Sequence, residues 1–145
     1  MGAHAIRPAR RADADAVWPL ARDFATSFVP TRAAFDATFP ALLDRDDTLL
    51  AVAERPTGVV GHVLASAHLT FLANGPVCWV EELMVDADHR GTGAGSALVR
   101  AVEDWAAERD AAYGSLASRR AGDFYRRLGY ADSATFFRKV TRRRG

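Results

Sequence analysis

Residues Val77 to Leu98 join a strand, a short loop and a glycine-rich helix start, and this junction constrains the fold more than any other part of the chain. They read VCWVEELMVDADHRGTGAGSAL, so an apolar strand with two adjacent acids leads through the loop into the helix. Gly91, Gly93 and Gly95 remove the side chains that would keep an anion away from the backbone. The unpaired N–H groups and positive dipole of a helix start attract negative charge. The segment therefore predicts a site for a phosphorylated ligand beside a carboxylate.

The spacing of the glycines argues against two common phosphate-binding loops. A Walker A loop ends in Gly-Lys-Ser or Gly-Lys-Thr, but Gly95 is followed by Ser96 and Ala97, without a lysine. A dinucleotide-binding fingerprint opens directly from a strand and has a third glycine where this chain has Ser96. Nucleotide hydrolysis and dinucleotide binding are therefore disfavoured.

The helix after the glycines has one apolar face. Its apolar residues recur at the spacing of an amphipathic helix: Ala94, Ala97, Leu98, Ala101, Val102 and Trp105. The helix therefore begins at the glycines, as anion binding requires. The alternative is that the glycines are present only because the turn needs positive φ angles.

A second segment, Arg119 to Tyr130, also predicts a helix. It reads RRAGDFYRRLGY, in which one face carries Ala121, Phe124, Tyr125 and Leu128. Gly129 follows as the left-handed residue just past the helix end. Without further context, Tyr125 would be interpreted as a core residue, because an aromatic stripe on a helix is usually buried.

Residues Val85 to Leu98 resemble the pyrophosphate loop of the GNAT superfamily of acyl-CoA-dependent N-acyltransferases. The family motif is Arg or Gln, two residues, Gly, one residue, and Gly or Ala; Arg90, Gly93 and Gly95 occupy its three positions. The resemblance implies acetyl-CoA as the cosubstrate. The residues implied to bind it are Leu83, Val85, Arg90, Gly91, Thr92, Gly93, Ala94, Gly95 and Ser96.

Further roles follow from the resemblance. In the family, the strand before the loop carries a bulge that splays it from the next strand, and its backbone pairs with the pantetheine arm; by position this implies Leu83 to Val85. Tyr125 occupies the position of the family's tyrosine, which implies a general acid for the departing thiolate of coenzyme A. One departure is Ala87, where the family often has proline.

N-acyl transfer also requires a group that takes a proton from the acceptor amine, and Glu81 and Glu82 are the candidates. Adjacent residues on a regular strand point to opposite faces, so only one acid can face the acceptor unless a bulge intervenes. Glu81 is preferred, because it matches an acid seen at this distance before the loop in some members of the family. Glu82 would then position the acceptor or hold another side chain. Either acid can instead form a structural salt bridge on the sheet.

Composition predicts one compact domain over residues 1–145. The chain has 49% apolar residues and a net charge of +1, which disfavours a nucleic-acid-binding protein. Apolar runs are short, and no signal-like segment opens the chain, so we expect a cytoplasmic protein without a membrane span. The basic residues 141–145 predict a mobile tail.

Neither the cysteine nor the histidines predict a metal site. Cys78 is the only cysteine, and its apolar strand favours a buried, inert thiol. His4, His62, His68 and His89 lack the spacing of metal ligands. His62 and His68 can share one face of a strand, so one of them can face the acceptor, although a structural role is favoured.

The predicted fold class is α/β (α+β), a single-domain GNAT-like fold with a mixed sheet of about six to seven strands flanked by about four helices. A helix is predicted around Val17 to Phe24, where Pro19 either kinks it or delays its start, and a second helix is predicted around Phe35 to Leu43, interrupted by Pro40. Asp13 is predicted to cap the first of them. The remaining strands are predicted at Ala3 to Arg7, Thr48 to Ala53, Val59 to Leu69, Tyr113 to Ala117 and Thr135 to Val140.

The strongest functional hypothesis is an acetyl-CoA-dependent N-acetyltransferase that acts on a primary amine of a small molecule or peptide. Dimers are common in the family, which implies a homodimer. A non-catalytic acyl-CoA-binding regulatory module is the alternative; it would keep the glycine loop but would need neither the acid pair nor Tyr125. The sequence does not identify the acceptor.

Overall fold

The computed structural model describes residues 4–142. In this range the chain forms a five-stranded sheet, four α-helices and two short 3-10 helices. The elements in chain order are β1 (Ala5–Pro8), η1 (Arg11–Asp13), α1 (Ala14–Phe24), α2 (Arg32–Leu43), β2 (Thr48–Arg55), β3 (Gly58–Thr70), β4 (Gly75–Val85), η2 (Ala87–His89), α3 (Ala94–Glu108), β5 (Gly114–Leu116) and α4 (Gly122–Arg127).

The sheet is mixed, with the strand order β1-β2-β3-β4-β5. The first three pairs are antiparallel, and β5 pairs with β4 in parallel. A parallel pair needs a crossover connection, which α3 provides. The α+β class and the four helices are confirmed, but the prediction of six to seven strands is wrong, since the described residues form five.

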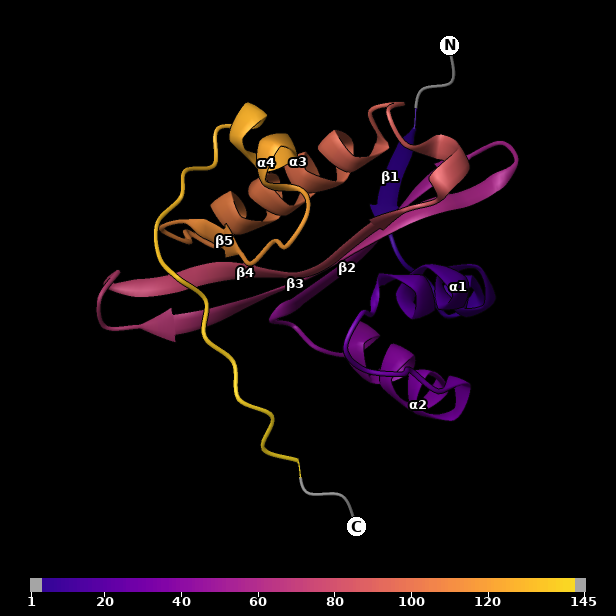
Figure 1. Ribbon diagram of the computed structural model, residues 1–145, viewed down its shortest axis with the longest axis horizontal. Helices are drawn as coiled ribbons and strands as arrows, with labels where there is room; N and C mark the ends of the chain where they lie inside the picture. Colours follow the sequence, from indigo (N-terminus) through magenta and orange to yellow (C-terminus); the bar gives the residue numbers. More distant parts are fainter. Residues whose placement is uncertain (1–3, 143–145) are drawn as a thin grey trace.

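The strand predicted at Thr135 to Val140 does not form. Residues 131–142 are exposed, have no regular secondary structure and make no backbone–backbone hydrogen bond within the described chain. Their aromatic side chains find other partners: Phe136 stacks on Trp79 with ring centroids 6.0 Å apart. Figure 1 shows this segment crossing β4 and running on toward the level of α2. Of the tail predicted at 141–145, residues 143–145 lie outside the described range.

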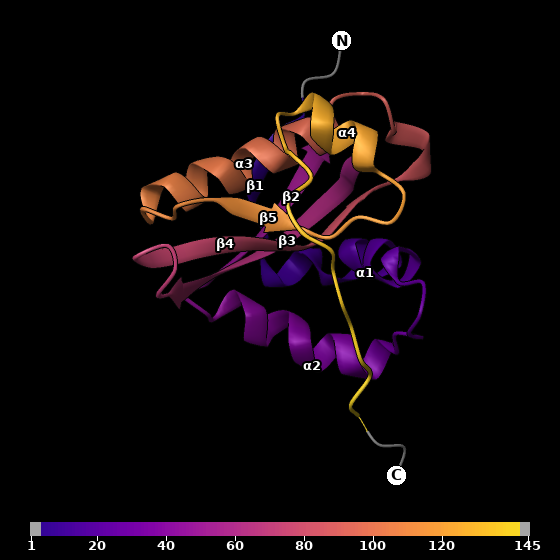
Figure 2. The ribbon, with the colours of Figure 1, turned by 60° about the vertical axis from the view of Figure 1, so that its left-hand side comes forward.

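Helices cover both faces of the sheet, as Figures 1 and 2 show. The face under α3 and the face under α1 and α2 each have an apolar core. The α3 core contains Ala51, Ala53, Val63, Ala65, Cys78, Val80, Leu98 and Val102. The opposite core contains Ala9, Val17, Phe39, Leu50 and Val52. This division assigns a face to each strand residue.

Helix α3 begins at Ala94, directly after Gly93, as predicted. Pro19 and Pro40 lie inside α1 and α2, and both helices continue through them, so the delayed start at Pro19 and the interruption at Pro40 are wrong. Packing of the apolar side chains Val17 and Phe39 against the sheet favours the helices despite the prolines. No helix of the described range is both long and apolar enough to cross a membrane.

Asp13 does not cap α1 with its side chain, contrary to the prediction. Its carboxylate instead accepts hydrogen bonds from Arg7 Nη1 at 2.8 Å, Arg7 Nη2 at 2.9 Å and the Arg10 N–H at 2.7 Å. Arg7 also binds Glu54, at 2.9 Å. The Arg7 guanidinium is the main reason that the pKa of Asp13 lies below its ordinary value. This cluster joins β1, η1 and β2.

Candidate active site

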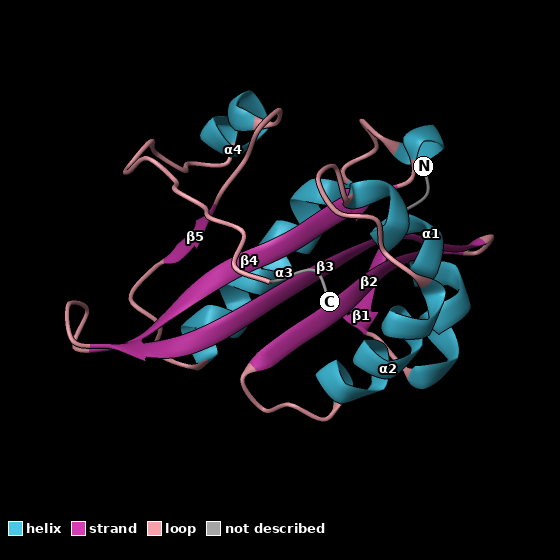
Figure 3. Cartoon of the chain, turned by 60° about the horizontal axis from the view of Figure 1, so that its bottom comes forward, coloured by secondary structure: helices cyan, strands magenta, loops and turns pink. Residues whose placement is uncertain are grey.

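The site predicted from the sequence lies where β4 and β5 diverge. β5 pairs only with Cys78–Val80, whereas β4 continues to Val85. Among the described residues, no strand pairs with the β5 side of β4 from residue 81 to 85, and Figure 3 shows the short β5 alongside only part of β4. The backbone of Leu83 and Val85 belongs to this stretch. The Val85 carbonyl oxygen accepts a hydrogen bond from Arg90 Nε; the other backbone groups on this side of the stretch have no strand partner and can bind an extended ligand, because backbone N–H and C=O groups need partners.

A bulge in β4 marks the start of this unpaired stretch. In the pairing with β3, Leu64 lies opposite Glu82 and Ala65 lies opposite Val80, so Glu81 is the extra residue. The family resemblance implies a bulged and splayed strand with the ligand-binding backbone at Leu83 to Val85. The irregularity itself lies at Glu81.

The bulge brings both acids to the face covered by α1 and α2. Val80 belongs to the α3 core, so alternation places its neighbour Glu81 on the opposite side. Glu82 pairs with Leu64, which packs with the core under α1 and α2. The two carboxylates are therefore on the same side, which a regular strand would not allow. Glu81 is exposed, whereas Glu82 is partly buried.

Glu82 has a buried partner that the sequence analysis did not identify as such. The Nε2 atom of His62 lies 3.3 Å from Glu82 Oε1. The side chain of His62 is 2% exposed, whereas that of Glu82 is 28% exposed. The sequence is compatible with a histidine of this strand facing the acceptor, although a structural role is favoured. The contact depends on the β3–β4 register, which has no signal in a single sequence.

The glycine loop is shaped for an anion. Gly91 and Gly93 have φ angles of +76° and +93°, which side chains rarely adopt. Gly93 is the N-cap of α3 and no side chain caps the helix, so the first N–H groups remain available to a ligand. The turn therefore requires these glycines, as the alternative interpretation holds, and the same geometry leaves the helix start open to an anion.

Side chains around the loop add polar groups and fix its position. Arg90 is exposed, and its Nε donates to the Val85 carbonyl oxygen over 3.3 Å, so the guanidinium lies between the end of β4 and the loop. Thr92 donates through Oγ1 to the His89 carbonyl oxygen. Ala94 is buried beneath the loop, and Ser96 is half-buried in the first turn of α3.

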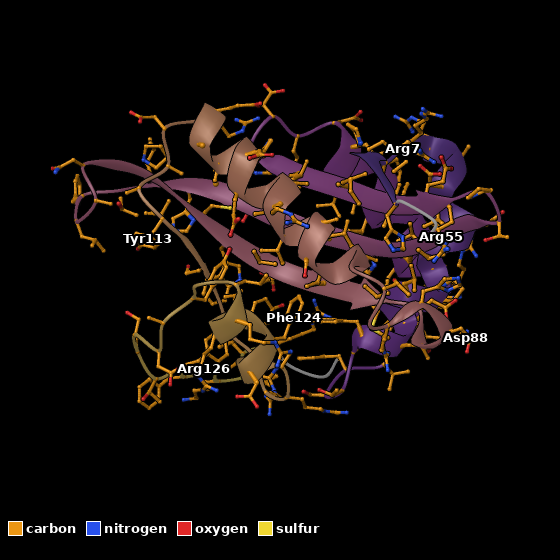
Figure 4. The ribbon with its side chains drawn as sticks, turned by 90° about the horizontal axis from the view of Figure 1, so that it is seen from above. Arg7, Arg55, Asp88, Tyr113, Phe124 and Arg126 are labelled. Carbon is orange, nitrogen blue, oxygen red and sulfur yellow. The ribbon has the colours of Figure 1, made fainter. Side chains whose placement is uncertain are left out.

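Helix α4 packs against the start of α3. A Cβ atom on Gly95 would lie 3.2 Å from Phe124 Cζ, so only glycine allows this approach without a shift. Figure 4 shows Phe124 pointing from α4 toward the start of α3. Gly129 has a φ of +96° just past α4, as predicted for the residue that ends this helix. The close contact at Gly95 thus joins the predicted anion site to the helix that carries Tyr125.

Tyr125 is half-buried in α4, in edge-on contact with Phe124 at 5.0 Å and Tyr130 at 5.8 Å between ring centroids. Burial raises the pKa of its phenol above the ordinary value, because the anion would lose hydration. The phenol is therefore protonated at neutral pH and able to donate a proton. Tyr130 anchors the same region through a 2.9 Å hydrogen bond from its hydroxyl to Glu103.

Cys78 lies in the core under α3, and burial raises the pKa of its thiol. This agrees with the predicted inert thiol. Within residues 4–142 the structure contains no cluster of three potential metal ligands.

Solved structures with the same fold include three acetyltransferases. The glucosamine-6-phosphate N-acetyltransferase of Arabidopsis thaliana superposes with a TM-score of 0.83 at 21% identity, over 95% of this chain and 98% of that chain. The aminoglycoside 6'-N-acetyltransferase of Acinetobacter haemolyticus gives 0.77 at 21% identity, over 95% and 99%. The ribosomal-protein-alanine N-acetyltransferase of Brucella melitensis gives 0.73 at 24% identity, over 97% and 99%.

At these identities the structural matches show a shared fold. No curated protein sequence matches the chain. The family assignment comes from the model of the acetyltransferase (GNAT) family, which matches residues 14–130. This range contains the bulged strand, the glycine loop and the helix with Tyr125. The chain belongs to the GNAT acetyltransferase family.

Proposed function

We propose that this protein transfers the acetyl group of acetyl-CoA directly to a primary amine. The observation that carries the proposal is the combination at one end of the sheet: an unpaired stretch of β4 adjoins the uncapped start of α3, and two carboxylates lie at the bulge. The first two features suit an extended ligand that ends in phosphates. The carboxylates suit a cationic amine.

In this proposal the N–H groups of the glycine loop and the first turn of α3 bind the pyrophosphate. Residues Gly91 to Ser96 supply these N–H groups. Arg90 adds a positive charge, since it forms no ion pair with an acidic side chain of the described residues. The backbone of Leu83 and Val85 pairs with the pantetheine arm. The donor molecule is thus held mainly by main-chain groups.

Three events then complete the transfer. Glu81 accepts a proton from the acceptor ammonium, directly or through a water molecule, and frees the nitrogen lone pair. The nitrogen bonds to the thioester carbon, and N–H groups between Leu83 and Val85 stabilise the oxyanion. The carbon–sulfur bond breaks, and Tyr125 donates its phenolic proton to the thiolate of coenzyme A. The nitrogen of the new amide loses its second proton, which returns through water to the Tyr125 phenolate, and Glu81 releases the first proton to solvent. The phenol carries its proton at neutral pH even at its ordinary pKa, and burial in the described structure only raises that pKa further.

The similar structures suggest a first panel of acceptors. Their names include glucosamine 6-phosphate, an aminoglycoside and a ribosomal protein alanine. We therefore propose a test with glucosamine 6-phosphate, kanamycin and an alanine-initiated peptide, together with n-propylamine as a minimal amine. Release of free coenzyme A measures the transfer, and mass spectrometry identifies the acetylated product.

Tyr125→Phe tests the catalytic part of the proposal. It removes the hydroxyl but keeps the ring contacts, so we expect kcat to fall about ten- to a thousandfold, the scale of one proton-transfer catalyst. Binding of acetyl-CoA, measured by calorimetry, should not change. An unchanged kcat would remove Tyr125 from the mechanism.

Glu81→Gln and Glu82→Gln separate the two acids. We expect Glu81→Gln to lower kcat, and Glu82→Gln to raise the KM for the amine. The reverse pattern would exchange the two roles. Binding of acetyl-CoA without acetylation of any amine would favour the non-catalytic acyl-CoA-binding module instead.

A further inference from the structure

The contact between the buried His62 and the partly exposed Glu82 is not explained by apolar packing alone. His62 lies on β3 opposite Val52 of β2 and Met84 of β4, and its side chain is 2% exposed. Apolar residues occupy both flanking positions, so an aliphatic side chain at position 62 would suit the surroundings. A histidine there brings two polar nitrogen atoms into the core.

Only one of these nitrogens has a partner. Nε2 lies 3.3 Å from Glu82 Oε1, and Nδ1 is buried without a hydrogen-bond partner among the described residues. An ionised carboxylate only accepts hydrogen bonds, so Nε2 must carry the hydrogen of this contact. His62 thus leaves one buried nitrogen without a partner, which costs free energy, while its other nitrogen donates to Glu82. A side chain that only filled space would not need this donor.

The contact leaves the second carboxylate oxygen of Glu82 free. Within the described range the side chain of Glu82 has no hydrogen bond or ion pair apart from that with His62. The Glu82 side chain is 28% exposed, so a ligand can reach it from the face that it shares with Glu81. A carboxylate held at one oxygen has fewer orientations to lose when the other binds a ligand.

We propose that His62 is a positioning residue that holds Glu82 Oε1, so that the other oxygen binds the acceptor as a cationic primary ammonium. The inference rests on the proposed function and narrows its substrate class to amines that arrive protonated. Glu82 binds the ammonium, and Glu81, one residue away on the bulge, takes the proton. His62 touches neither substrate and acts through Glu82.

Two substitutions separate positioning from packing. His62→Gln keeps an N–H donor near the Nε2 position, whereas His62→Leu keeps the bulk and removes the donor. We expect His62→Leu to raise the KM for the amine about ten- to hundredfold, the scale of one hydrogen bond to a charged group. We expect His62→Gln to stay close to wild type, and the Kd for acetyl-CoA to be the same in all three proteins.

The outcomes distinguish the two proposals. Equal KM values in wild type and His62→Leu, or equal losses in both variants with lower thermal stability, would overturn the positioning role while the acetyltransferase proposal stands. Failure of the wild type to bind acetyl-CoA would overturn the acetyltransferase proposal.

A titration without acetyl-CoA tests the ammonium site independently. In protein labelled with ¹⁵N-histidine, the ring signals of His62 should shift when n-propylammonium chloride is added, and should not shift with sodium chloride at equal ionic strength. Glu82→Gln should abolish the response. Absence of the shift in the wild type would overturn the inference, whatever the result with acetyl-CoA.

Discussion

Placing a negative charge at Gly93 provides the sharpest test of the pyrophosphate site. Gly93 is exposed and caps α3, and a Cβ atom built on it meets no other atom within 4 Å. A side chain therefore fits, but its φ of +93° strains any residue other than glycine, at a cost of about 1–2 kcal/mol. Gly93→Glu and Gly93→Gln share this strain and differ only in charge.

The expected difference between the two variants follows from Coulomb's law. A carboxylate roughly 5 Å from one phosphate charge, in a medium close to water, costs about 0.8 kcal/mol. Two phosphate charges double this to about 1.7 kcal/mol, and partial exclusion of water by the ligand raises it to roughly 3 kcal/mol. The Kd for acetyl-CoA should therefore be about 20- to 150-fold higher in Gly93→Glu than in Gly93→Gln.

Isothermal titration calorimetry with acetyl-CoA measures this ratio, and thermal unfolding of both variants checks that the strain is equal. Added salt should shrink the ratio, because the loop is exposed to solvent. Equal affinities of the Glu and Gln variants at low salt would refute the reasoning, since no phosphate would then lie near Gly93.

Two further predictions concern stability and reactivity. Asp13→Asn should lower the free energy of unfolding at neutral pH by about 2–3 kcal/mol, because it weakens the hydrogen bonds to Arg7 and Arg10. Since the pKa of Asp13 is lowered in the folded protein, its contribution is present above the ordinary carboxyl pKa and is lost as pH falls through the lowered value, so urea unfolding of wild type and variant should converge in acid. Cys78, with its raised pKa, should react with Ellman's reagent only as fast as the protein unfolds; rapid labelling of the native protein would contradict the burial.

Local patterns predicted the parts of the fold that depend on neighbouring residues. The start of α3 directly after Gly93 is confirmed, because glycine spacing and apolar periodicity act within a few positions. The last strand failed for the opposite reason. Residues 135–140 have strand-like composition, but a strand requires a partner, and Phe136 packs on Trp79 instead.

The candidate site was predicted in its parts and not in its arrangement. The glycine loop, Tyr125 and the two acids all have signals in the sequence. The relation between the acids has none, because it depends on how β4 pairs with β3. Whether both acids face the acceptor depends on a bulge, and a bulge has no signature in this sequence.

The extra residue at Glu81 also makes the His62–Glu82 contact possible. In a regular strand, residues 80 and 82 share a face, and Val80 belongs to the core under α3. Without the bulge, Glu82 would point into that core, where an unpaired carboxylate is costly, and away from His62. One inserted residue therefore interrupts the register with β3 beside the open edge of β4 and turns Glu82 toward the buried histidine. β4 diverges from β5 at the same point of the sheet where the bulge orients the two acids. The proposed transfer requires the open strand edge and the acids side by side.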